Sequence, residues 1–526
     1  MEASISNARG LATGREPVRA VSLTAAARFA EHVLAALLYS RSEERRVGKE
    51  GAWLAPGLLL FSARQMRPRA ALLGGVAFSM LIGYGITGWA IDATLVYYDA
   101  NRLLSTGFAA LVWLLYGGIP YGLMLAAYTA AARRFSYAAR PALGATLWAG
   151  SELLRASLLT GMPWALLGHT QHANLTIVQI ADLGGVYAVS FVLVFVSVAL
   201  VELIAERLEQ GTVPLRRRLA IPALILGATV VYGWWRYEPH VPEGAPGARR
   251  IAVVQGNIAN QFRWQRSYFE RSLAIYAGLT ADSRADRPEL VVWPENAVNF
   301  YVDREPLLRA RLGALARSIP EGLIFGGPRL DEEDRAFISA YFLDPSGAIA
   351  ATYDKRHLVP FAEYDPLPWY GGTSRADALV NGGKRAAPLP IAPFGVGLVI
   401  CYEVLFPDLV RAGVAQGAQL LVNMSNDSWL DHGDGAAPQQ HFSMAIFRAI
   451  ETRRYLVRAA SSGVSGFVSP SGEAYARIES GERGALTASV APMTEITPYV
   501  RFGDAWIFLA NGLALALFAR RRQSAA

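Results

Sequence analysis

The sequence predicts an α-helical domain that crosses a membrane several times, followed by a layered α/β domain. Hydrophobic residues make up 52% of the 526-residue chain and charged residues only 18%. This composition is rich for a soluble protein and indicates membrane spans. The apolar content is also uneven, because long apolar stretches dominate residues 24–238 whereas residues 249–495 have the mixed composition of an ordinary α/β domain.

The helical part is predicted from apolar stretches, several of which reach the ~20 residues that a spanning helix needs. Seven of them precede the α/β domain and one follows it: 24–40, 52–63, 70–92, 104–131, 140–160, 176–205 and 219–236, then 504–519. The predicted domains are therefore an N-terminal segment at 1–23, about seven helices at 24–238, the α/β domain at 249–495 and a C-terminal transmembrane helix at 504–519.

The arginines of the chain indicate which way it crosses the membrane. If the eight stretches alternate in direction, five arginine-rich segments fall on one side, which the positive-inside rule makes the cytoplasm. These arginines are Arg9, Arg15, Arg19, Arg64, Arg67, Arg69, Arg133, Arg134, Arg140, Arg216, Arg217, Arg218, Arg520, Arg521 and Arg522. The α/β domain is then expected outside the cytoplasmic membrane, although the charged run 40–50 does not fit this alternation.

Nucleic acid is not an expected partner, although the formal net charge is +7. The basic residues lie largely at the ends of apolar stretches, where membrane topology alone would place them. The sequence shows no basic stripe interleaved with aromatic residues and no zinc knuckle.

Short β-rich runs separated by helical patterns predict the α/β domain. Fully apolar runs such as LVVW and GLVI suit a sheet that is covered on both faces. The sequences DPSG (344–347) and SPSG (469–472) indicate hairpin turns. The segment 438–461, which starts with a proline, is predicted to form one long helix.

The chain has a single cysteine, Cys401, in the segment ICYE. One cysteine can form neither an internal disulfide nor a thiolate metal site, so it is either a buried filler or a nucleophile. Two further segments favour the nucleophile: VVWPEN contains Glu295, and YDKRHLVPFAEY contains Lys355 and Glu363. A lone buried cysteine is more often structural, and a single Glu or Lys is equally ambiguous. It is the appearance of all three residue types, each at the end of an apolar run, that indicates a Glu-Lys-Cys catalytic set.

These side chains can divide the work of acyl transfer through a thioester. A thiol has an ordinary pKa near ~8.5, and a nearby ammonium or helix N-terminus stabilises the thiolate. Lys355 can provide the ammonium, and a helix N-terminus is available if EVLFPDLVRAG, in the turn-like or helical segment after Cys401, begins a helix. Glu295 can take the thiol proton and return it later. Lys355 and the backbone N–H that follows the cysteine can stabilise a tetrahedral oxyanion.

The three segments resemble the nitrilase (carbon–nitrogen hydrolase) superfamily, whose Glu-Lys-Cys triad lies on an α-β-β-α sandwich. With several spans before this domain and one after it, the chain beyond about residue 20 resembles bacterial apolipoprotein N-acyltransferases. The resemblance implies Glu295 as general base, Lys355 as the triad lysine and Cys401 as nucleophile. It also implies four substrate-binding or supporting residues: Trp264, Glu363, Tyr402 and Glu403.

The resemblance implies a two-step reaction in the bacterial inner membrane, with the catalytic domain on its outer side. Cys401 would take an acyl chain from a phospholipid and pass it to the N-terminal amine of a diacylglyceryl-cysteine in an apolipoprotein. No cofactor and no metal are implied. Two other functions remain open: a membrane-tethered amidase that acts on small amides, and a transporter or scaffold without enzymatic activity. The sequence does not indicate the preferred head group or acyl length, the docking of the lipoprotein or the oligomeric state.

Two charged residues stand inside the predicted span 140–160. Glu152 and Arg155 are three positions apart, so they share a helix face and can neutralise each other. They are either a structural pair that fixes helix packing or part of a site where lipid or substrate docks. His357 and His441 belong to no metal-ligand pattern and are expected to be structural.

Overall fold

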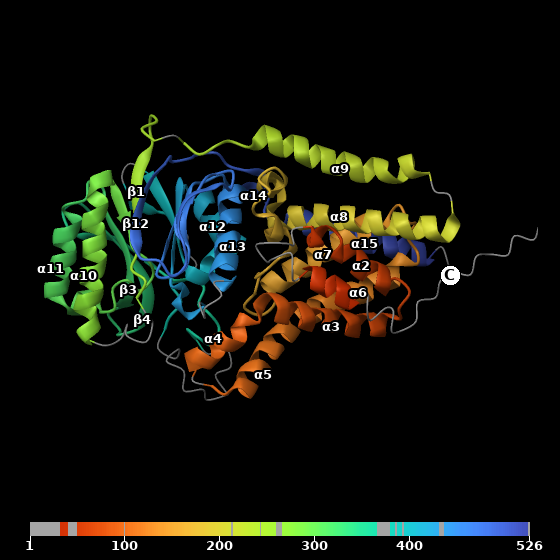
Figure 1. Ribbon diagram of the computed structural model, residues 1–526, viewed down its shortest axis with the longest axis horizontal. Coiled ribbons are helices and arrows are strands. Elements are labelled where there is room, and N and C mark those ends of the chain that lie inside the picture. Colours follow the sequence, from red (N-terminus) through yellow and green to blue (C-terminus); the bar gives the residue numbers. More distant parts are fainter. Residues whose placement is uncertain are drawn as a thin grey trace, which may run out of the picture.

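The computed structural model describes residues 32–39, 50–98, 100–211, 214–241, 243–258, 266–364, 379–383, 387–391, 394–430 and 436–523. The predicted segment 1–23, most of the charged run 40–50 and Trp264 lie outside these residues. The described chain forms a helix bundle and an α/β domain that lie end to end (Figure 1).

The bundle is built from the apolar stretches of the first half of the chain and from the last helix. Its helices are α2 (Ala55–Ala63), α3 (Pro68–Thr87), α4 (Trp89–Tyr98), α5 (Arg102–Trp113), α6 (Ile119–Ala132), α7 (Arg140–Ser157), α8 (Ala181–Gln210), α9 (Leu215–Arg236) and α15 (Ala505–Gln523). Four segments are long and apolar enough to cross a membrane: 68–87, 102–132, 177–209 and 215–236. Two shorter apolar helices lie at 51–63 and 505–520. The number of spans and their orientation stay predictions.

One predicted stretch, 70–92, is divided into two helices in the structure. Helix α3 ends at Thr87, and α4 begins at Trp89. Helices α4 and α5 contact each other and form a hairpin at the end of the bundle that faces the α/β domain (Figure 1). A π-helical turn (Leu114–Gly118) joins α5 to α6, next to Pro120, whose ring nitrogen cannot donate a helical hydrogen bond.

The α/β domain contains two six-stranded sheets stacked face to face. The first has the order β12 (Gly484–Val490), β1 (Arg249–Gln255), β2 (Leu290–Val292), β3 (Gly322–Leu330), β4 (Ala336–Leu343), β5 (Ile349–Asp354). The second has the order β11 (Ala474–Ile478), β10 (Ser465–Val468), β9 (Leu456–Ala460), β8 (Leu420–Ser425), β7 (Phe394–Ile400), β6 (Leu389–Ile391). In each sheet three neighbouring strands are parallel: β1, β2 and β3 in the first, and β7, β8 and β9 in the second.

Helices cover the outer face of each sheet, which gives the predicted α-β-β-α order of layers (Figure 1). Helices α10 (Arg266–Asp282) and α11 (Pro306–Ala316) cover the first sheet. Helices α12 (Pro407–Ala415) and α13 (Ala436–Thr452) cover the second. Because α13 also contacts α8, one hydrophobic core continues from the second sheet into the bundle. The fold class predicted from the sequence is confirmed.

The prediction of one helix over 438–461 is wrong. Helix α13 ends at Thr452, and Arg453 adopts a left-handed backbone conformation with φ of 51°. The next residues form β9, which pairs in parallel with β8 and antiparallel with β10. The backbone therefore exchanges helical hydrogen bonds for two strand ladders in the centre of the sheet. The hairpins predicted at 344–347 and 469–472 are present between β4 and β5 and between β10 and β11.

The connection between α8 and α9 lies at the end of the bundle far from the α/β domain (Figure 1), and arginines contact glutamates of the C-terminal part of α8 there. Arg64 forms ion pairs with Glu202 and Glu209, and Arg140 forms one with Glu202. Arg133 donates to two backbone carbonyls in the connection between α2 and α3. This end of the bundle carries arginines that the predicted topology places in the cytoplasm, and Arg64 and Arg140 are paired with glutamates there.

Candidate active site

The three predicted catalytic residues each follow a strand. Glu295 follows β2, Lys355 follows β5 and Cys401 follows β7. All three are buried, with exposed fractions of 3%, 0% and 2%. A buried charged group requires partners, so their contacts decide whether they form one site.

Lys355 joins two carboxylates. Its Nζ donates to Glu295 Oε1 at 3.1 Å and to Glu363 Oε1 at 2.6 Å. Burial alone would lower the pKa of Lys355, but the charges of Glu295, Glu363 and Cys401 raise it well above its usual value. Lys355 is therefore a permanent ammonium, and two of its three N–H groups are occupied by the carboxylates.

Glu295 is held in place by backbone on two sides. Its Oε2 accepts a hydrogen bond from the backbone N–H of Asn426 at 2.8 Å. On the other side it lies against Gly326 of β3, where an added Cβ would stand 2.7 Å from the Cα of Glu295. Asn426 belongs to SNDSW, directly after β8, but the sequence could not reveal this contact because it is made by the main chain.

Cys401 lies at a strained turn between β7 and the following helical segment. Its φ is 51°, in the left-handed region that non-glycine residues rarely adopt. Such strain is concentrated at functional sites. An α-helix does not begin directly after the cysteine: Cys401 begins a 3-10 turn (Cys401–Leu405), and α12 begins only at Pro407.

The thiol of Cys401 is protonated at neutral pH, contrary to the expectation of a stabilised thiolate. Burial and the charge of Glu295 raise the pKa of Cys401 far above its usual value, and the opposing effects of Lys355 and Ser425 are smaller. A protonated thiol needs a base before it can attack a carbonyl carbon. The carboxylates of Glu295 and Asp427 both raise the pKa of this thiol, and Glu295 has the larger effect. Glu295 is also the one of the two that contacts Lys355.

Glu363 and Glu403 have different surroundings. Glu363 contacts Lys355 and accepts from the backbone N–H of Val359 at 2.8 Å, and burial raises its pKa. Glu403 has no hydrogen bond to Lys355. Its carboxylate accepts four hydrogen bonds, from the backbone N–H groups of Ile400, Arg356 and His357 and from the hydroxyl of Tyr353. Glu403 therefore ties the turn at the cysteine to the segment that carries the lysine.

Tyr402 connects the α/β domain to the bundle. Its hydroxyl donates to the backbone carbonyl of Gly161 at 2.9 Å, in the segment that follows α7. The neighbouring His357 ring lies 3.8 Å from the ring of Phe406, and burial lowers the pKa of His357 to about 4. His357 is thus neutral and packed, as expected of a structural residue.

A buried charged cluster lies behind the nucleophile. Asp427 accepts from Arg458 Nη2 at 2.8 Å and from Ser425 Oγ at 2.6 Å, and His441 Nδ1 lies 3.1 Å from its Oδ1. Burial would raise the pKa of Asp427, but Arg458 and His441 lower it. Burial and Arg458 lower the pKa of His441. Within the described residues, no group of three or more His, Cys, Asp or Glu is arranged to hold a metal ion.

An apolar cavity of about 150 Å³ lies between the bundle and the α/β domain. Its walls come from the α4–α5 hairpin, from the segment between Lys355 and Glu363 and from residues next to Cys401 and Asn426. The lining residues are Thr87, Trp89, Ala90, Ala93, Thr94, Phe108, Ala109, Val112, Trp113, Tyr116, Met162, Trp164, Val359, Pro360, Phe361, Ala362, Tyr402 and Trp429. We call this space the acyl-side cavity.

Glu152 and Arg155 do not form the ion pair that their spacing suggests. Glu152 accepts from Trp148 Nε1 at 3.1 Å and from the backbone N–H of Leu167 at 2.8 Å. Arg155 donates to other, uncharged groups. Both side chains lie on one helix, but their partners come from different neighbouring segments, so sequence spacing alone could not identify them.

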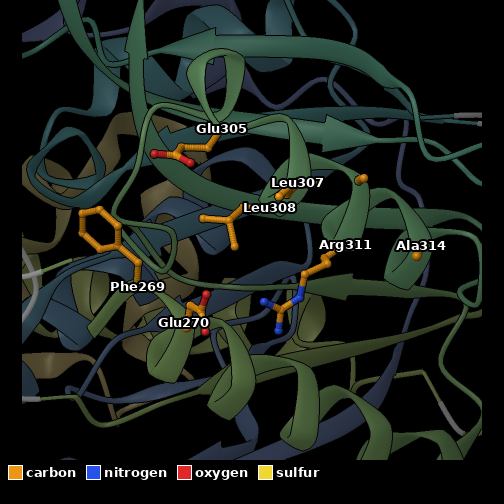
Figure 2. A pocket seen from close by; sticks show the side chains of 8 residues that line it. Phe269, Glu270, Glu305, Leu307, Leu308, Arg311 and Ala314 are labelled. Carbon is orange, nitrogen blue, oxygen red and sulfur yellow. The ribbon is translucent and has the colours of Figure 1, made fainter. Parts of the chain in front are cut away.

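A hollow larger than the acyl-side cavity lies away from this site. It measures about 810 Å³ and lies between α10 and α11, on the layer farthest from the bundle (Figures 1 and 2). Its lining residues are Phe269, Glu270, Glu305, Leu307, Leu308, Ala310, Arg311 and Ala314. None of the described candidate residues lines it, so size alone does not locate the chemistry.

Comparisons with known proteins agree with both parts of the chain. The family model of carbon–nitrogen hydrolases matches residues 250–498, and that of the apolipoprotein N-acyltransferase N-terminal domain matches residues 49–199. The apolipoprotein N-acyltransferase of Geobacter metallireducens is 34% identical over 90% of this chain and 91% of its own length. That of Pseudomonas syringae pv. tomato is 30% identical over 84% of this chain and 86% of its own length.

Among solved structures, an amidase of the nitrilase superfamily from Nesterenkonia AN1 covers 51% of this chain and 98% of its own, with 22% identity and a TM-score of 0.40. The assignment of the family rests on the curated relatives, which match the bundle and the α/β domain together. The chain belongs to the apolipoprotein N-acyltransferase family.

Proposed function

We propose that this protein transfers an acyl chain from a membrane phospholipid, through a thioester on Cys401, to the N-terminal amine of diacylglyceryl-cysteine in apolipoproteins. The acyl-side cavity carries this proposal. It is apolar and is built jointly by the bundle and the α/β domain. It is lined by residues 359–362, which lie between Lys355 and Glu363 in the chain, and by Tyr402, which follows Cys401. An amidase for small soluble amides has no use for an apolar space whose second wall is a membrane helix hairpin.

In the first step the sulfur of Cys401 attacks the ester carbonyl carbon of the phospholipid. Glu295 takes the thiol proton, because the thiol is protonated at rest and the charge of Glu295 raises the pKa of the thiol. The third N–H of Lys355 and the backbone N–H of Tyr402 stabilise the tetrahedral oxyanion. The carbon–oxygen bond then breaks, and Glu295 returns the proton to the leaving glycerol oxygen. The products are a lysophospholipid and the thioester.

In the second step the acceptor amine attacks the thioester carbonyl carbon. Glu295 takes a proton from the attacking nitrogen, the carbon–sulfur bond breaks, and the proton passes to the leaving sulfur. The products are an amide and the original thiol, so the site returns to its starting state. An amide is more stable than a thioester, so this step runs downhill.

The supporting residues divide into two roles. Glu363 orients Lys355 through the contact at 2.6 Å. Glu403 holds the backbone on both sides of the reacting groups. Tyr402 fixes the α/β domain to the loop after α7 and lines the acyl-side cavity. For Trp264 the proposal of a substrate contact rests on the family resemblance.

The location proposed for this chemistry is the outer face of the bacterial inner membrane. The end of the bundle that carries these arginines lies opposite the α/β domain, which supports an α/β domain outside the cytoplasm. Four membrane-capable helices, two shorter apolar helices and an apolar cavity open between the two parts support a lipid donor that stays in the bilayer.

The decisive experiment is to incubate the purified full-length protein in detergent micelles with a phospholipid that carries a labelled acyl chain. The label is expected on Cys401 as a hydroxylamine-sensitive thioester, and an added diacylglyceryl peptide should remove it as an amide. Hydrolysis of small amides without any labelled thioester would favour the amidase instead. A Cys401→Ala variant that still supports lipoprotein N-acylation in cells would support a scaffold.

A further inference from the structure

Arg155, near the end of α7, is a cation whose hydrogen-bond partners are all uncharged. It donates to the carbonyl of Tyr116 at 3.1 Å, to the hydroxyl of Tyr121 at 3.1 Å and to the carbonyl of Trp164 at 2.9 Å. No carboxylate oxygen of the described residues lies within 4.0 Å of it, and Glu152, one turn earlier, binds elsewhere. A charge inside a membrane domain is costly unless it is neutralised.

The guanidinium of Arg155 borders an open space. With Tyr116 and Tyr121 it lines a cavity of about 50 Å³. Three of its five N–H groups are used by the three contacts above, which leaves two for a ligand. This cavity and the acyl-side cavity have six lining residues in common: Thr87, Val112, Trp113, Tyr116, Met162 and Trp164.

A short loop links this cation to the nucleophile. The hydroxyls of Tyr116 and Thr160 lie 2.8 Å apart, and the next residue, Gly161, accepts the hydrogen bond of Tyr402. Tyr402 directly follows Cys401 in the chain. Arg155 therefore lines a cavity that shares a wall with the acyl-side cavity, and Tyr402, the residue after the nucleophile, lines the acyl-side cavity.

We propose that Arg155, with the hydroxyl of Tyr121, binds the phosphodiester of the donor phospholipid while the acyl chain occupies the acyl-side cavity. This inference rests on the proposed function and names how the donor is recognised. The phosphate is the anionic group that every diacyl phospholipid carries, and it is a phosphodiester whenever a head-group alcohol is attached. A guanidinium with two free N–H groups matches two phosphate oxygens, and in an apolar setting such a pair is strong.

The experiment compares two donors that carry the same ester and the same acyl chains but differ in the phosphate. Full-length protein in micelles is given phosphatidylglycerol or diacylglycerol, and the acyl group on Cys401 is measured by mass spectrometry. Wild type should be acylated faster by the phospholipid. Arg155→Gln should lose at least about 10-fold of the phospholipid rate and less than about 2-fold of the diacylglycerol rate. Arg155→Lys should keep part of the preference, because it keeps the charge.

The matched control is Arg133→Gln. Arg133 also donates to two backbone carbonyls between helices, but it lies at the opposite end of the bundle. It should leave the rates with both donors unchanged. Retained stability of each variant is checked by thermal unfolding in the same micelles.

Three results would overturn the assignment. Equal loss with both donors in Arg155→Gln would make Arg155 a purely structural residue. An unchanged preference of Arg155→Gln for phosphatidylglycerol over diacylglycerol would mean that Arg155 does not bind the phosphate. Inhibition of wild-type acylation from diacylglycerol by inorganic phosphate, absent in Arg155→Gln, would assign the site to a free anion. If wild type forms no thioester from either donor, the proposed function fails first, and that outcome is distinct from the other three.

Discussion

The acyl-side cavity is enclosed by the α/β domain (the α/β wall) and by the bundle (the helix wall). These two parts hold their buried cations in opposite ways, although neither cation lines the cavity itself. On the α/β wall, Lys355 contacts two carboxylates, Glu295 and Glu363. On the helix wall, Arg155 contacts only carbonyls and a hydroxyl. A cation that already has counter-charges can stabilise a transient oxyanion, whereas a cation without them needs a ligand that brings its own charge. This difference is what the proposed division of roles requires, with the reaction on the α/β wall and recognition of the lipid on the helix wall.

The largest effects are expected on the α/β wall. Cys401→Ser should fold like wild type, because the change in volume is small, but should form no thioester. Glu295→Gln should lower acyl transfer by about 10³-fold, within the range for removal of a general base. Both are measured with labelled phospholipid in micelles. Normal acyl-enzyme in Glu295→Gln would assign the proton transfer to another group.

Glu403→Gln tests whether an acid on the same wall acts only through structure. A glutamine offers one oxygen and a donor group where the carboxylate accepts four hydrogen bonds, so at least one backbone N–H loses its partner. We expect a loss of about 2–3 kcal/mol in the free energy of unfolding, measured by denaturant titration. Glu363→Gln, which leaves these bonds intact, should change the rate of acyl transfer more than the stability. The reverse pattern would mean that the two roles are exchanged.

The helix wall is tested by filling the cavity. Ala109 is buried and lines the acyl-side cavity, so Ala109→Phe should exclude long acyl chains. The value of KM for a phospholipid with long acyl chains should rise by about 10-fold, while a donor with a two-carbon acyl group should be unaffected. Ala127→Phe on α6, where the side chain is exposed, is the matched control. An equal effect on donors with short and long acyl chains would mean that Ala109→Phe disturbs the acyl-transfer step and not the binding of the acyl chain.

The charges on the α/β wall also predict opposite effects on the reactivity of the thiol. Glu295 raises the pKa of Cys401 and Lys355 lowers it, so Glu295→Gln should increase alkylation by iodoacetamide at pH 7 to 9, and Lys355→Ala should decrease it. A change of several-fold in each direction is expected, because one pKa unit is tenfold in thiolate. In wild type the rate should rise with pH through this whole range. A plateau near pH 7 would mean that the resting sulfur is already a thiolate.

The smallest effect is expected at the hollow between α10 and α11. Leu307→Ala removes its most exposed apolar side chain, which is 82% exposed. Acyl transfer and stability should stay within about twofold and ~0.5 kcal/mol of wild type. A larger loss of activity would mean that the acceptor protein uses this face.

The sequence predicted the layers of the α/β domain and the strand ends where the three reactive residues lie. Each reactive residue follows an apolar strand core, and that pattern is local. The sequence did not predict β9, because the helical pattern of α13 continues in the sequence past Thr452. In the structure the helix ends there, since Arg453 adopts a left-handed backbone conformation.

The sequence also could not predict contacts that are made by the main chain or by segments far apart in the chain. The N–H of Asn426 on Glu295 carries no side-chain signal. The acyl-side cavity is assembled from pieces more than 300 residues apart in the chain. The protonated state of Cys401 depends on burial, which a motif does not reveal.

Helix α13 is buried along almost its whole length, between the second sheet and the bundle. The α/β domain also continues from α9 at one end and into α14 (Pro498–Phe502) and α15 at the other. An α/β domain that is packed against the bundle through α13 and joined to it at both ends is not expected to rotate away from the bundle to reach its reactants. Under the proposed function, the donor and the acceptor then reach the α/β domain by lateral diffusion in the bilayer. The rate of turnover should therefore depend on the surface density of each lipid in the bilayer. Adding buffer to the vesicles, which lowers the bulk concentration but not the surface density, should leave the rate unchanged.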